Sequence, residues 1–448
     1  MLAGLGRLAA ALTEFSQRYI PSAFSIAVLL TFVTFGLALV VARAAPARVV
    51  IEWGSGFWTL VPFAMQMALI VLTGYLVSTA PPVDRGFRAL ARQARSPRGA
   101  VVLMATVSMG LAWFHWGLSL IGCAMFVRHV ARAEPRVDYR LLVCAAYFGM
   151  GATWHAGLSA SAPLLVATPG HFLEDRIGII PVADTIFHPF NLGLALLVVV
   201  VLAGLAWAMH PADAETRVVD PAVLEALDIS QPAPAPDAGT PAGWIDHTRW
   251  LNLAVASAGL GWLTWHFATK GLVLTLDVLN FAFLMLAILL HRSPAALVAA
   301  ADRGASLLAG IVLQFPFYAG MYGVIQGTGL AEIIGDWIAS TASADTLPVW
   351  LYWYSGLVNY FVPSGGSKWA IEAPYLIDAA SRLGVPTEQV VLAYAWGDMS
   401  TDIIQPFWAL PLLAAARLGF RDIMGYAALV FLVYNAVVSV AFYLLPRL

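Results

Sequence analysis

The sequence predicts an all-α polytopic membrane protein, and three observations support this fold class. Hydrophobic residues make up 60% of the 448 residues and charged residues only 11%, well below the roughly 25% typical of water-soluble chains. Several apolar runs are long enough to cross a hydrocarbon core about 30 Å thick. The sequence lacks the alternating segments of about ten residues that form membrane barrels, so we expect helices throughout.

We expect about nine transmembrane helices and two re-entrant helical hairpins. In chain order, the expected crossings lie near residues 20–42, 57–80, 141–166, 187–209, 250–269, 271–291, 305–330, 390–415 and 423–446. The hairpins are expected at 99–127 and 347–380, where apolar segments are interrupted near the middle. Such a hairpin satisfies its backbone internally except at the tip, which must lie against protein or water.

Arginines flank the first hairpin on both sides. They are Arg85, Arg88, Arg92, Arg95 and Arg98 before it, and Arg128, Arg132, Arg136 and Arg140 after it. Because positively charged loops favour the cytoplasm, both ends of this hairpin are expected inside. The second hairpin has acidic or sparsely charged flanks and is expected to enter from outside. We also expect a cytoplasmic N-terminus, since no cleavable signal pattern precedes the first span.

The two halves of the chain resemble each other. Residues 58–67 are echoed by 312–321, and Pro163-Leu-Leu by Pro411-Leu-Leu. A connecting crossing without a counterpart would invert the second half, which gives two inverted repeats; tandem parallel repeats with ordinary crossings are the alternative. In transporters, repeats interrupted at matching places surround the substrate site.

This organisation divides the chain into four parts. They are a first repeat at 1–209, a proline-rich cytoplasmic linker at 210–247, a connecting transmembrane helix at 248–270 and a second, inverted repeat at 271–448. The prolines of 231–241 favour extended structure, with a short helix expected around 221–227.

The tip of the second hairpin, Pro363-Ser-Gly-Gly-Ser-Lys368, is the strongest candidate for a substrate site. Its glycines leave N–H groups uncovered at the start of a helix, where a small anion binds. Ser364 and Ser367 add hydroxyl donors. An ammonium group at this depth is costly, so Lys368 is either functional or paired, with Glu372 one turn away as a structural partner.

The corresponding residues of the first half are more aromatic. Trp113, His115 and Trp116 interrupt the first hairpin, where both cavity lining and simple packing fit. His115 has the chemistry to exchange protons near neutral pH, or it is satisfied by one backbone partner. The next span is also interrupted, and it adds the candidates Thr153, Trp154, Ser159 and Ser161.

A polar interruption in the second half predicts ion coupling. Unwound carbonyls beside Ser, Thr and Asp oxygens suit Na⁺, and a buried Asp can carry a proton. The alternative is that the aspartates pair with Lys368 or cap a broken helix. The candidate residues are Asp398, Ser400, Thr401, Asp402, Thr153 and Gln405, the first four of which form a candidate Na⁺ site. No other cofactor is expected.

The sequence contains no G-x-S-x-G, H-E-x-x-H or P-loop motif. The usual sequence motifs of ATP-driven transporters and of common hydrolases are therefore absent, and we expect neither an enzyme nor a nucleic-acid partner.

Four separated motifs resemble the bacterial short-chain fatty acid transporter family: Val362-Pro-Ser-Gly-Gly366, Gln405-Pro-Phe-Trp-Ala-Leu-Pro-Leu412, Arg421-Asp-Ile-Met-Gly425 and Phe63-Ala-Met-Gln-Met-Ala-Leu69. The resemblance covers essentially the whole chain. It implies an inner-membrane secondary transporter, distantly related to the ion transporter superfamily, whose members form homodimers with scaffold and transport domains. Where the family has a third glycine and then a histidine, this chain has Ser367 and Lys368.

The predicted function is ion-coupled transport of short-chain monocarboxylates such as acetoacetate and butyrate. The carboxylate is expected on Ser364, Gly365, Gly366 and Lys368, and the apolar tail against Trp113, Trp116, Trp154 or Trp369. Two alternatives remain. One is a cation/proton exchanger whose aspartates are the substrate site, and the other is a membrane-embedded enzyme handling acyl groups through His115, His155 or Asp398.

Overall fold

The computed structural model describes residues 18, 21, 23–220, 223–224, 240–405, 408–409, 412–413 and 416–445. Within these residues every regular element is a helix, which confirms the predicted all-α class. Most of the short helix expected around 221–227 and part of the motif at 405–412 lie outside the described residues.

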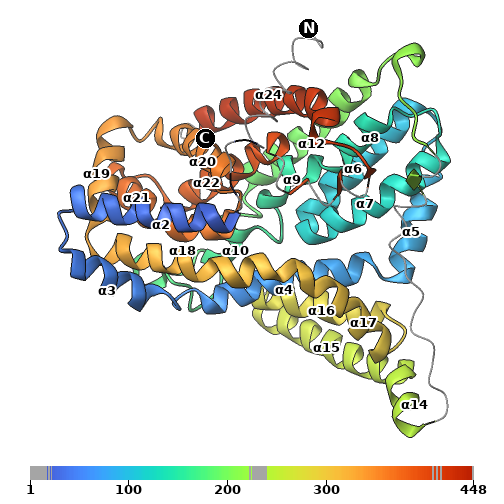
Figure 1. Ribbon diagram of the computed structural model, residues 1–448, viewed down its shortest axis with the longest axis horizontal. Coiled ribbons are helices and arrows are strands. Elements are labelled where there is room, and N and C mark those ends of the chain that lie inside the picture. Colours follow the sequence, from blue (N-terminus) through green and yellow to red (C-terminus); the bar gives the residue numbers. More distant parts are fainter. Residues whose placement is uncertain are drawn as a thin grey trace.

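The helices form two groups that lie one above the other in Figure 1. The first group comprises α2 (Ala23–Val40), α3 (Pro46–Gly56), α4 (Val61–Ser78), α15 (Arg249–Lys270), α16 (Leu276–Leu290), α17 (Pro294–Ala305) and α18 (Ala309–Gly327). The second group comprises α6 (Pro97–Phe114), α7 (Trp116–Ala133), α8 (Tyr139–Ala146), α9 (Phe148–Ala152), α12 (Pro189–Met209), α20 (Leu347–Phe361), α22 (Thr387–Ser400) and α24 (Phe420–Leu444).

Further helices connect or flank the two groups. They are α5 (Pro81–Ala91), α10 (Ser161–Val166), α11 (Glu174–Ile177), α14 (Pro241–His247), α19 (Leu330–Thr341) and α21 (Gly365–Leu383). α4 packs against α7, and α18 packs against α21. These contacts join the first group to the helices that carry the two predicted hairpin tips.

Both predicted hairpins are pairs of helices broken where the sequence indicated. α6 and α7 are separated by His115 alone, whose backbone is extended at φ −162° and ψ 108°, and they pack against each other. α20 and α21 are separated by residues 362–364. In this second pair α20 packs mainly on α22 and α21 mainly on α19, so its two arms are more widely separated.

The two halves make matching contacts. α3 packs on α18 as α17 packs on α4, and α2 packs on α18 as α16 packs on α4. Likewise α5 packs on α7 as α19 packs on α21. Two repeats of the same unit would produce such equivalent contacts, in which helices of one half pack on the corresponding helices of the other. The inverted orientation of the halves stays a prediction.

The spans expected at 141–166 and 390–415 are interrupted. The first consists of α8, α9, the 3₁₀ turn η1 (Trp154–Ala156) and α10, and in the second η4 (Asp402–Ile404) follows α22. Glycines permit close backbone approach here. A Cβ on Gly157 would lie 2.0 Å from the carbonyl oxygen of Trp113, and one on Gly397 would lie 2.1 Å from that of Tyr352. The broken spans therefore lie directly on α6 and α20.

In the part of the chain that the structure describes, five helical stretches are long and apolar enough to cross a membrane: Val61–Ser78, Pro97–Phe114, Pro189–Met209, Pro294–Gly327 and Phe420–Leu444. Phe24–Val40 and Leu276–Leu290 are shorter apolar helices. The segment expected at 305–330 begins earlier, because α17 and α18 run on through the 3₁₀ turn η3 (Ser306–Leu308). The connecting segment forms the 22-residue α15, with Trp250, Trp262 and Trp265 exposed. The number of crossings stays a prediction.

Candidate functional site

The tips of the two helix pairs meet at two adjoining cavities. The larger, about 160 Å³, is lined by Trp116 from the first tip, by Ser364 from the second, and by Ile311 and Phe315 of α18. The smaller, about 50 Å³, shares these four residues. Its wall is completed by Met67, Met150, Trp154, Ser161, Asn359, Pro363, Gly365, Gly366, Asp402 and Trp408. Both cavities therefore lie between the two groups of helices.

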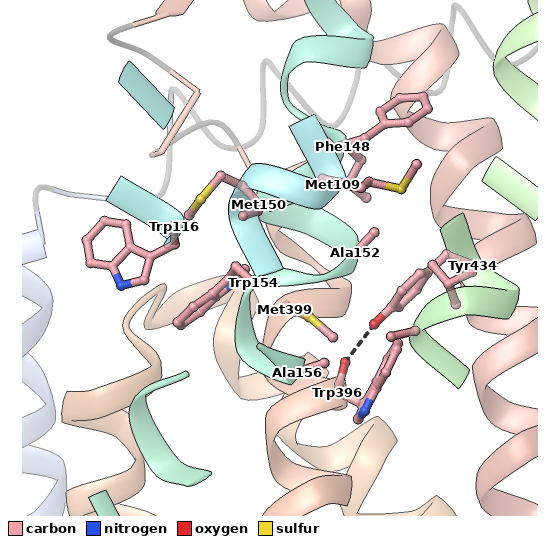
Figure 2. Close-up of a cluster of buried hydrophobic side chains, with 14 of the residues drawn as sticks. Met109, Trp116, Phe148, Met150, Ala152, Trp154, Ala156, Trp396, Met399 and Tyr434 are labelled. Carbon is pink, nitrogen blue, oxygen red and sulfur yellow. Dashed lines mark hydrogen bonds between the residues drawn. The ribbon is translucent and has the colours of Figure 1, made fainter. Parts of the chain in front are cut away.

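Aromatic side chains cover one side of this site. The ring centroid of Trp116 lies 6.1 Å from that of Trp154 and 5.6 Å from that of Trp408. Figure 2 shows Trp116, Met150 and Trp154 at one edge of a buried cluster, with Trp396 and Tyr434 at the other. The Trp116 backbone N–H donates to Ser159 Oγ at 2.9 Å, which fastens the first tip to the broken span.

The second tip is held by hydrogen bonds to its carbonyl groups. Tyr394 donates to the carbonyl of Gly365 at 2.6 Å, and Trp408 Nε1 donates to that of Pro363 at 2.9 Å. Ser364 Oγ donates to Ser367 Oγ at 2.9 Å. α21 begins at Gly365, and the first N–H groups of a helix have no acceptor within it. The start of α21 therefore presents backbone donors and partial positive charge at the smaller cavity.

Glycine is required at this helix start by its neighbours. A Cβ on Gly365 would lie 2.6 Å from His155 Cε1 and 2.7 Å from Asp398 Oδ2. A Cβ on Gly366 would lie 2.8 Å from Phe63 Cζ. The glycines of the predicted Ser-Gly-Gly turn therefore have two roles: they allow close packing against neighbouring side chains, and they leave the backbone uncovered at the smaller cavity.

Lys368 is paired, which is one of the two alternatives that the sequence left open. Its Nζ lies 3.0 Å from Asp398 Oδ1 and donates to the carbonyl and the hydroxyl of Ser355 at 2.8 and 2.6 Å. It also lies 4.4 Å above the ring of Tyr394. Lys368 is 1% exposed and is not among the residues lining either cavity.

His155 completes this ion pair, although our sequence reasoning did not place it in the transport site. Its Nδ1 lies 2.8 Å from Asp398 Oδ2, and its Nε2 accepts from the N–H of Ala162 at 3.2 Å. These two contacts assign the neutral tautomer with hydrogen on Nδ1. Trp154 stacks on the imidazole at 4.2 Å between ring centroids. The available signal was a histidine inside an interrupted apolar span.

Asp402 lies in the wall of the smaller cavity. Its Oδ2 accepts from Trp154 Nε1 at 3.1 Å, and its Oδ1 accepts from Asn359 Nδ2 at 2.8 Å. Asn359 also donates to Thr401 Oγ1 at 3.1 Å. Asn359 is a site residue that was not predicted from the sequence; the available signal was a polar amide just before the break in the second pair.

The four residues of the candidate Na⁺ site have separate partners. Ser400 Oγ donates to the carbonyl of Gly397 at 2.6 Å, and Thr401 Oγ1 to that of Gly356 at 2.9 Å. Asp398 faces Lys368, whereas Asp402 faces Trp154. Among the described residues no cluster of three or more Asp, Glu, His or Cys side chains is placed to hold a metal ion. Sodium binding at these residues stays a prediction.

The other candidates lie at or behind the cavities. Ser161 lines the smaller one. Thr153 Oγ1 donates to the carbonyl of Met109 at 2.8 Å, and Gln405 is buried. The fully buried Trp369 packs on Tyr394 with 4.7 Å between ring centroids.

Two aromatic candidates lie apart from the cavities. Trp113 packs on Phe114 and Phe187 and lines a different groove against α12. His115 caps α7, because its Nδ1 accepts from the N–H of Leu118 at 3.3 Å. This contact is the single backbone partner of the second alternative for His115, whose Nε2 is buried without a hydrogen-bond partner; a role in proton exchange stays a prediction.

Solved structures of membrane transporters share this fold of apolar helices. The chain superposes on the YdaH transporter of Alcanivorax borkumensis with a TM-score of 0.66 at 18% identity, covering 95% of this chain and 98% of that one. For MtrF of Neisseria gonorrhoeae, described within a class of antimetabolite efflux pumps, the TM-score is 0.58 at 16% identity, with 98% and 97% covered.

The chain belongs to the short chain fatty acid transporter family, whose model matches residues 4–445. It is 39% identical over 423 residues to an Escherichia coli (strain K12) protein assigned as a short-chain fatty acid transporter, covering 94% of this chain and 96% of the relative. A Haemophilus influenzae protein with the same assignment is 37% identical over 436 residues, covering 95% and 97%. The resemblance inferred from the motifs is confirmed, and the chain is a multi-pass membrane transporter.

Proposed function

We propose that this protein is a secondary active transporter of short-chain fatty acids or related monocarboxylates, such as acetoacetate and butyrate, across the bacterial inner membrane. The observation that carries this proposal is the meeting of a helix start, rich in backbone donors, with an apolar cavity. A short-chain fatty acid has the same two parts, a carboxylate and a small apolar tail.

The carboxylate is proposed to bind in the smaller cavity at the start of α21. N–H groups of Gly365 and Gly366 supply donors, and a helix start favours negative charge. The hydroxyl of Ser364 would add a third donor by turning from Ser367 Oγ to the carboxylate. The ammonium of Lys368 lies one helical turn behind Ser364 and is held by Asp398. In this proposal Lys368 contributes through the electric field and through the rigidity of the tip.

The tail is proposed to occupy the larger cavity. Its wall is mainly apolar and includes Val71, Leu120, Ile121, Leu307, Ile311 and Val362. Burying each methylene there is worth about 0.8 kcal/mol. The proposed site therefore binds a chain of a few carbons more tightly than it binds acetate.

Ion coupling is proposed to use the buried carboxylates of the second half. Asp402 in the wall of the smaller cavity would repel a bound anion unless a cation or proton offset its charge. Binding of substrate and coupling ion would then favour each other, which is the requirement for symport. The candidate ions are Na⁺ and H⁺.

Uptake by reconstituted vesicles tests the proposal. Vesicles containing the purified protein should accumulate labelled butyrate and acetoacetate under an imposed proton or sodium gradient. Protein-free vesicles are the control, because short-chain acids also cross bilayers as neutral molecules. Sodium–proton exchange without organic-acid flux would instead identify a cation exchanger, and acyl turnover without any gradient would identify an enzyme.

A further inference from the structure

The described residues contain a buried carboxylate that the proposed substrate site does not use. Glu372 of α21 is 1% exposed, and neither of its carboxylate oxygens has a hydrogen-bond partner. The nearest charge is Lys368, whose Nζ lies 3.8 Å from Glu372 Oε2. Buried carboxylates in folded proteins are normally hydrogen-bonded or closely paired.

The charges around Lys368 do not balance if both neighbouring carboxyls are ionised. Lys368 lies closer to Asp398, at 3.0 Å, than to Glu372, and Ser355 takes its other hydrogen bonds. His155 is neutral in the tautomer that its contacts require. One ammonium therefore faces two carboxyl groups in a medium where an unpaired charge is very costly. A proton on one carboxyl removes this imbalance.

Asp398 is a poor place for that proton. Its two oxygens face Lys368 at 3.0 Å and His155 Nδ1 at 2.8 Å, and both are donors that favour a negative charge. Glu372 has one such neighbour, Lys368, at the longer distance of 3.8 Å, so a proton there disturbs fewer contacts. The geometry therefore points to Glu372 as the protonated member of the pair.

Among the described residues, the helices packed on α21 bring no second cation within ion-pair distance of Glu372. Arg176 of α11 reaches α21 at the carbonyl of Pro374 and pairs with Asp378. α20 contributes Tyr354 and α22 contributes Tyr394 and Asp398, while α21 itself adds Tyr375, whose hydroxyl lies 2.8 Å from that of Tyr354. The titratable groups of the other neighbours have partners elsewhere or are exposed. On α19, Asp336 pairs with Arg382, and Glu332 is exposed. On α18, Tyr318 donates to Gln314 and Tyr322 donates to the carbonyl of Phe172. α10 contains no titratable residue.

Glu372 is also connected to the proposed substrate site along one helix face. Ser364, Lys368 and Glu372 are spaced four residues apart at the start of α21, so their side chains follow one another along that face. Ser364 lines both cavities and Lys368 joins the tip to α22. A shift of Lys368 from Asp398 towards Glu372 would stabilise an ionised Glu372 and release its proton, and Asp398 would then be held by the hydrogen bond from His155 Nδ1.

We propose that Glu372 is the proton-binding site that couples transport to a proton gradient, with Lys368 moving between the two carboxyls as the proton leaves and returns. The proton comes from water on one side of the membrane, resides on a Glu372 oxygen while substrate is carried, and leaves to water on the other side. This inference rests on the proposed function and adds the identity of the coupling ion and its binding residue.

Glu372→Gln tests the inference, because glutamine has the shape of a protonated glutamate and cannot release a proton. In reconstituted vesicles we expect counterflow exchange of labelled butyrate to persist. After subtraction of the signal from protein-free vesicles, accumulation driven by a proton gradient should fall about tenfold or more. The butyrate-dependent proton flux seen with an internal pH indicator should fall to the level of protein-free vesicles. Glu332→Gln, the same change at an exposed position of α19, is the matched control and should behave like the unmodified protein.

The outcomes separate the inference from the proposed function. Gradient-driven accumulation with normal proton flux in Glu372→Gln would overturn the assignment of Glu372, as would accumulation driven only by sodium. Loss of counterflow in a variant that keeps its melting temperature would overturn it too. Glu372→Asp, which keeps a titratable carboxyl, should retain some proton flux, and a folded Glu372→Asp variant without any would count against the inference. No butyrate exchange by the unmodified protein would contradict the proposed function itself.

Discussion

The ammonium of Lys368 has a structural role in this protein and is not placed to contact a substrate directly. Its ammonium is held by Asp398 and Ser355 inside the second group of helices. Removing one partner of a buried ion pair leaves an uncompensated charge, which typically costs about 3–5 kcal/mol. Lys368 therefore stabilises the site first, and any influence on the substrate acts through this pair.

Lys368→Met should strongly destabilise the protein, because Asp398 would keep only His155 as a partner. We expect a clear fall in the melting temperature of the detergent-solubilised protein. The double variant Lys368→Met with Asp398→Asn removes both charges, and the asparagine carbonyl still accepts from His155. It should recover more than half of the loss. A double variant as unstable as the sum of its single changes would contradict this pairing.

Gly365→Ala should impair transport by filling the space between the second tip and its neighbours. The new Cβ would meet His155 Cε1 at 2.6 Å and Asp398 Oδ2 at 2.7 Å. Forcing an extra methyl group into packed surroundings costs about 1–3 kcal/mol, so butyrate uptake should fall about tenfold. Gly110→Ala is the matched control, because among the described residues no atom apart from its chain neighbours and its own helix backbone lies within 4 Å of its Cβ position. Equal uptake by the two variants would contradict the close contact at Gly365.

At the scale of elements, α5 is fastened to the end of α7 by a cluster around Asp84. Asp84 Oδ1 lies 3.1 Å from Arg128 Nη2 and 2.7 Å from His129 Nε2, and Oδ2 lies 3.0 Å from Arg88 Nη2. Burial alone would raise the pKa of Asp84. The hydrogen bond with His129 and the charges of His129, Arg128 and Arg88 outweigh it and hold that pKa below its ordinary 3.8. Two arginines first used to predict membrane orientation thus also hold the end of the first helix pair.

Asp84→Asn should remove a pH-dependent part of the stability. Because folding lowers the pKa of Asp84, the folded state favours the ionised carboxylate, and this stabilisation is present above pH 3.8 and lost as pH falls through the folded-state pKa. The melting temperature of the unmodified protein should exceed that of Asp84→Asn at about pH 6. The difference should shrink in acid.

A matched control for this pH series is Asp302→Asn, since Asp302 is an exposed residue of α17. Its melting temperature should follow that of the unmodified protein at every pH. A gap for Asp84→Asn that stays constant into acid would show that the cluster stabilises α5 by packing rather than by charge.

At the scale of the whole molecule, the sequence predicted the elements better than their contacts. The breaks at His115 and at residues 362–364 were predicted because polar residues and glycines inside apolar runs are local signals. The choice of Asp398 over Glu372 as the closer partner of Lys368 depends on how α22 packs beside α21. The meeting of Asn359 with Asp402 likewise depends on α20 lying against the broken span. No local pattern encodes these tertiary contacts.

The membrane orientation of the two helix pairs is the remaining whole-molecule prediction. If each pair is re-entrant and the halves are inverted, both flanks of the first pair face the cytoplasm and both flanks of the second face outside. Single cysteines at the exposed positions Arg95, Arg132, Ser343 and Ser381 report these four flanks. The buried Cys123 and Cys144 are replaced by alanine in all of them.

A membrane-impermeant maleimide should label right-side-out vesicles at Ser343→Cys and Ser381→Cys but not at Arg95→Cys or Arg132→Cys. Inverted vesicles should give the opposite result, and a permeant maleimide should label all four variants as the accessibility control. Labelling of Arg95→Cys and Arg132→Cys from opposite sides would mean that α6 and α7 together make an ordinary crossing. The tandem parallel arrangement would then replace the inverted one. If Arg95→Cys and Arg132→Cys are instead labelled from the inside and Ser343→Cys and Ser381→Cys from the outside, the two helix pairs enter the membrane from opposite faces. The starts of α7 and α21 then approach each other from opposite sides, as an alternating-access site between inverted repeats requires.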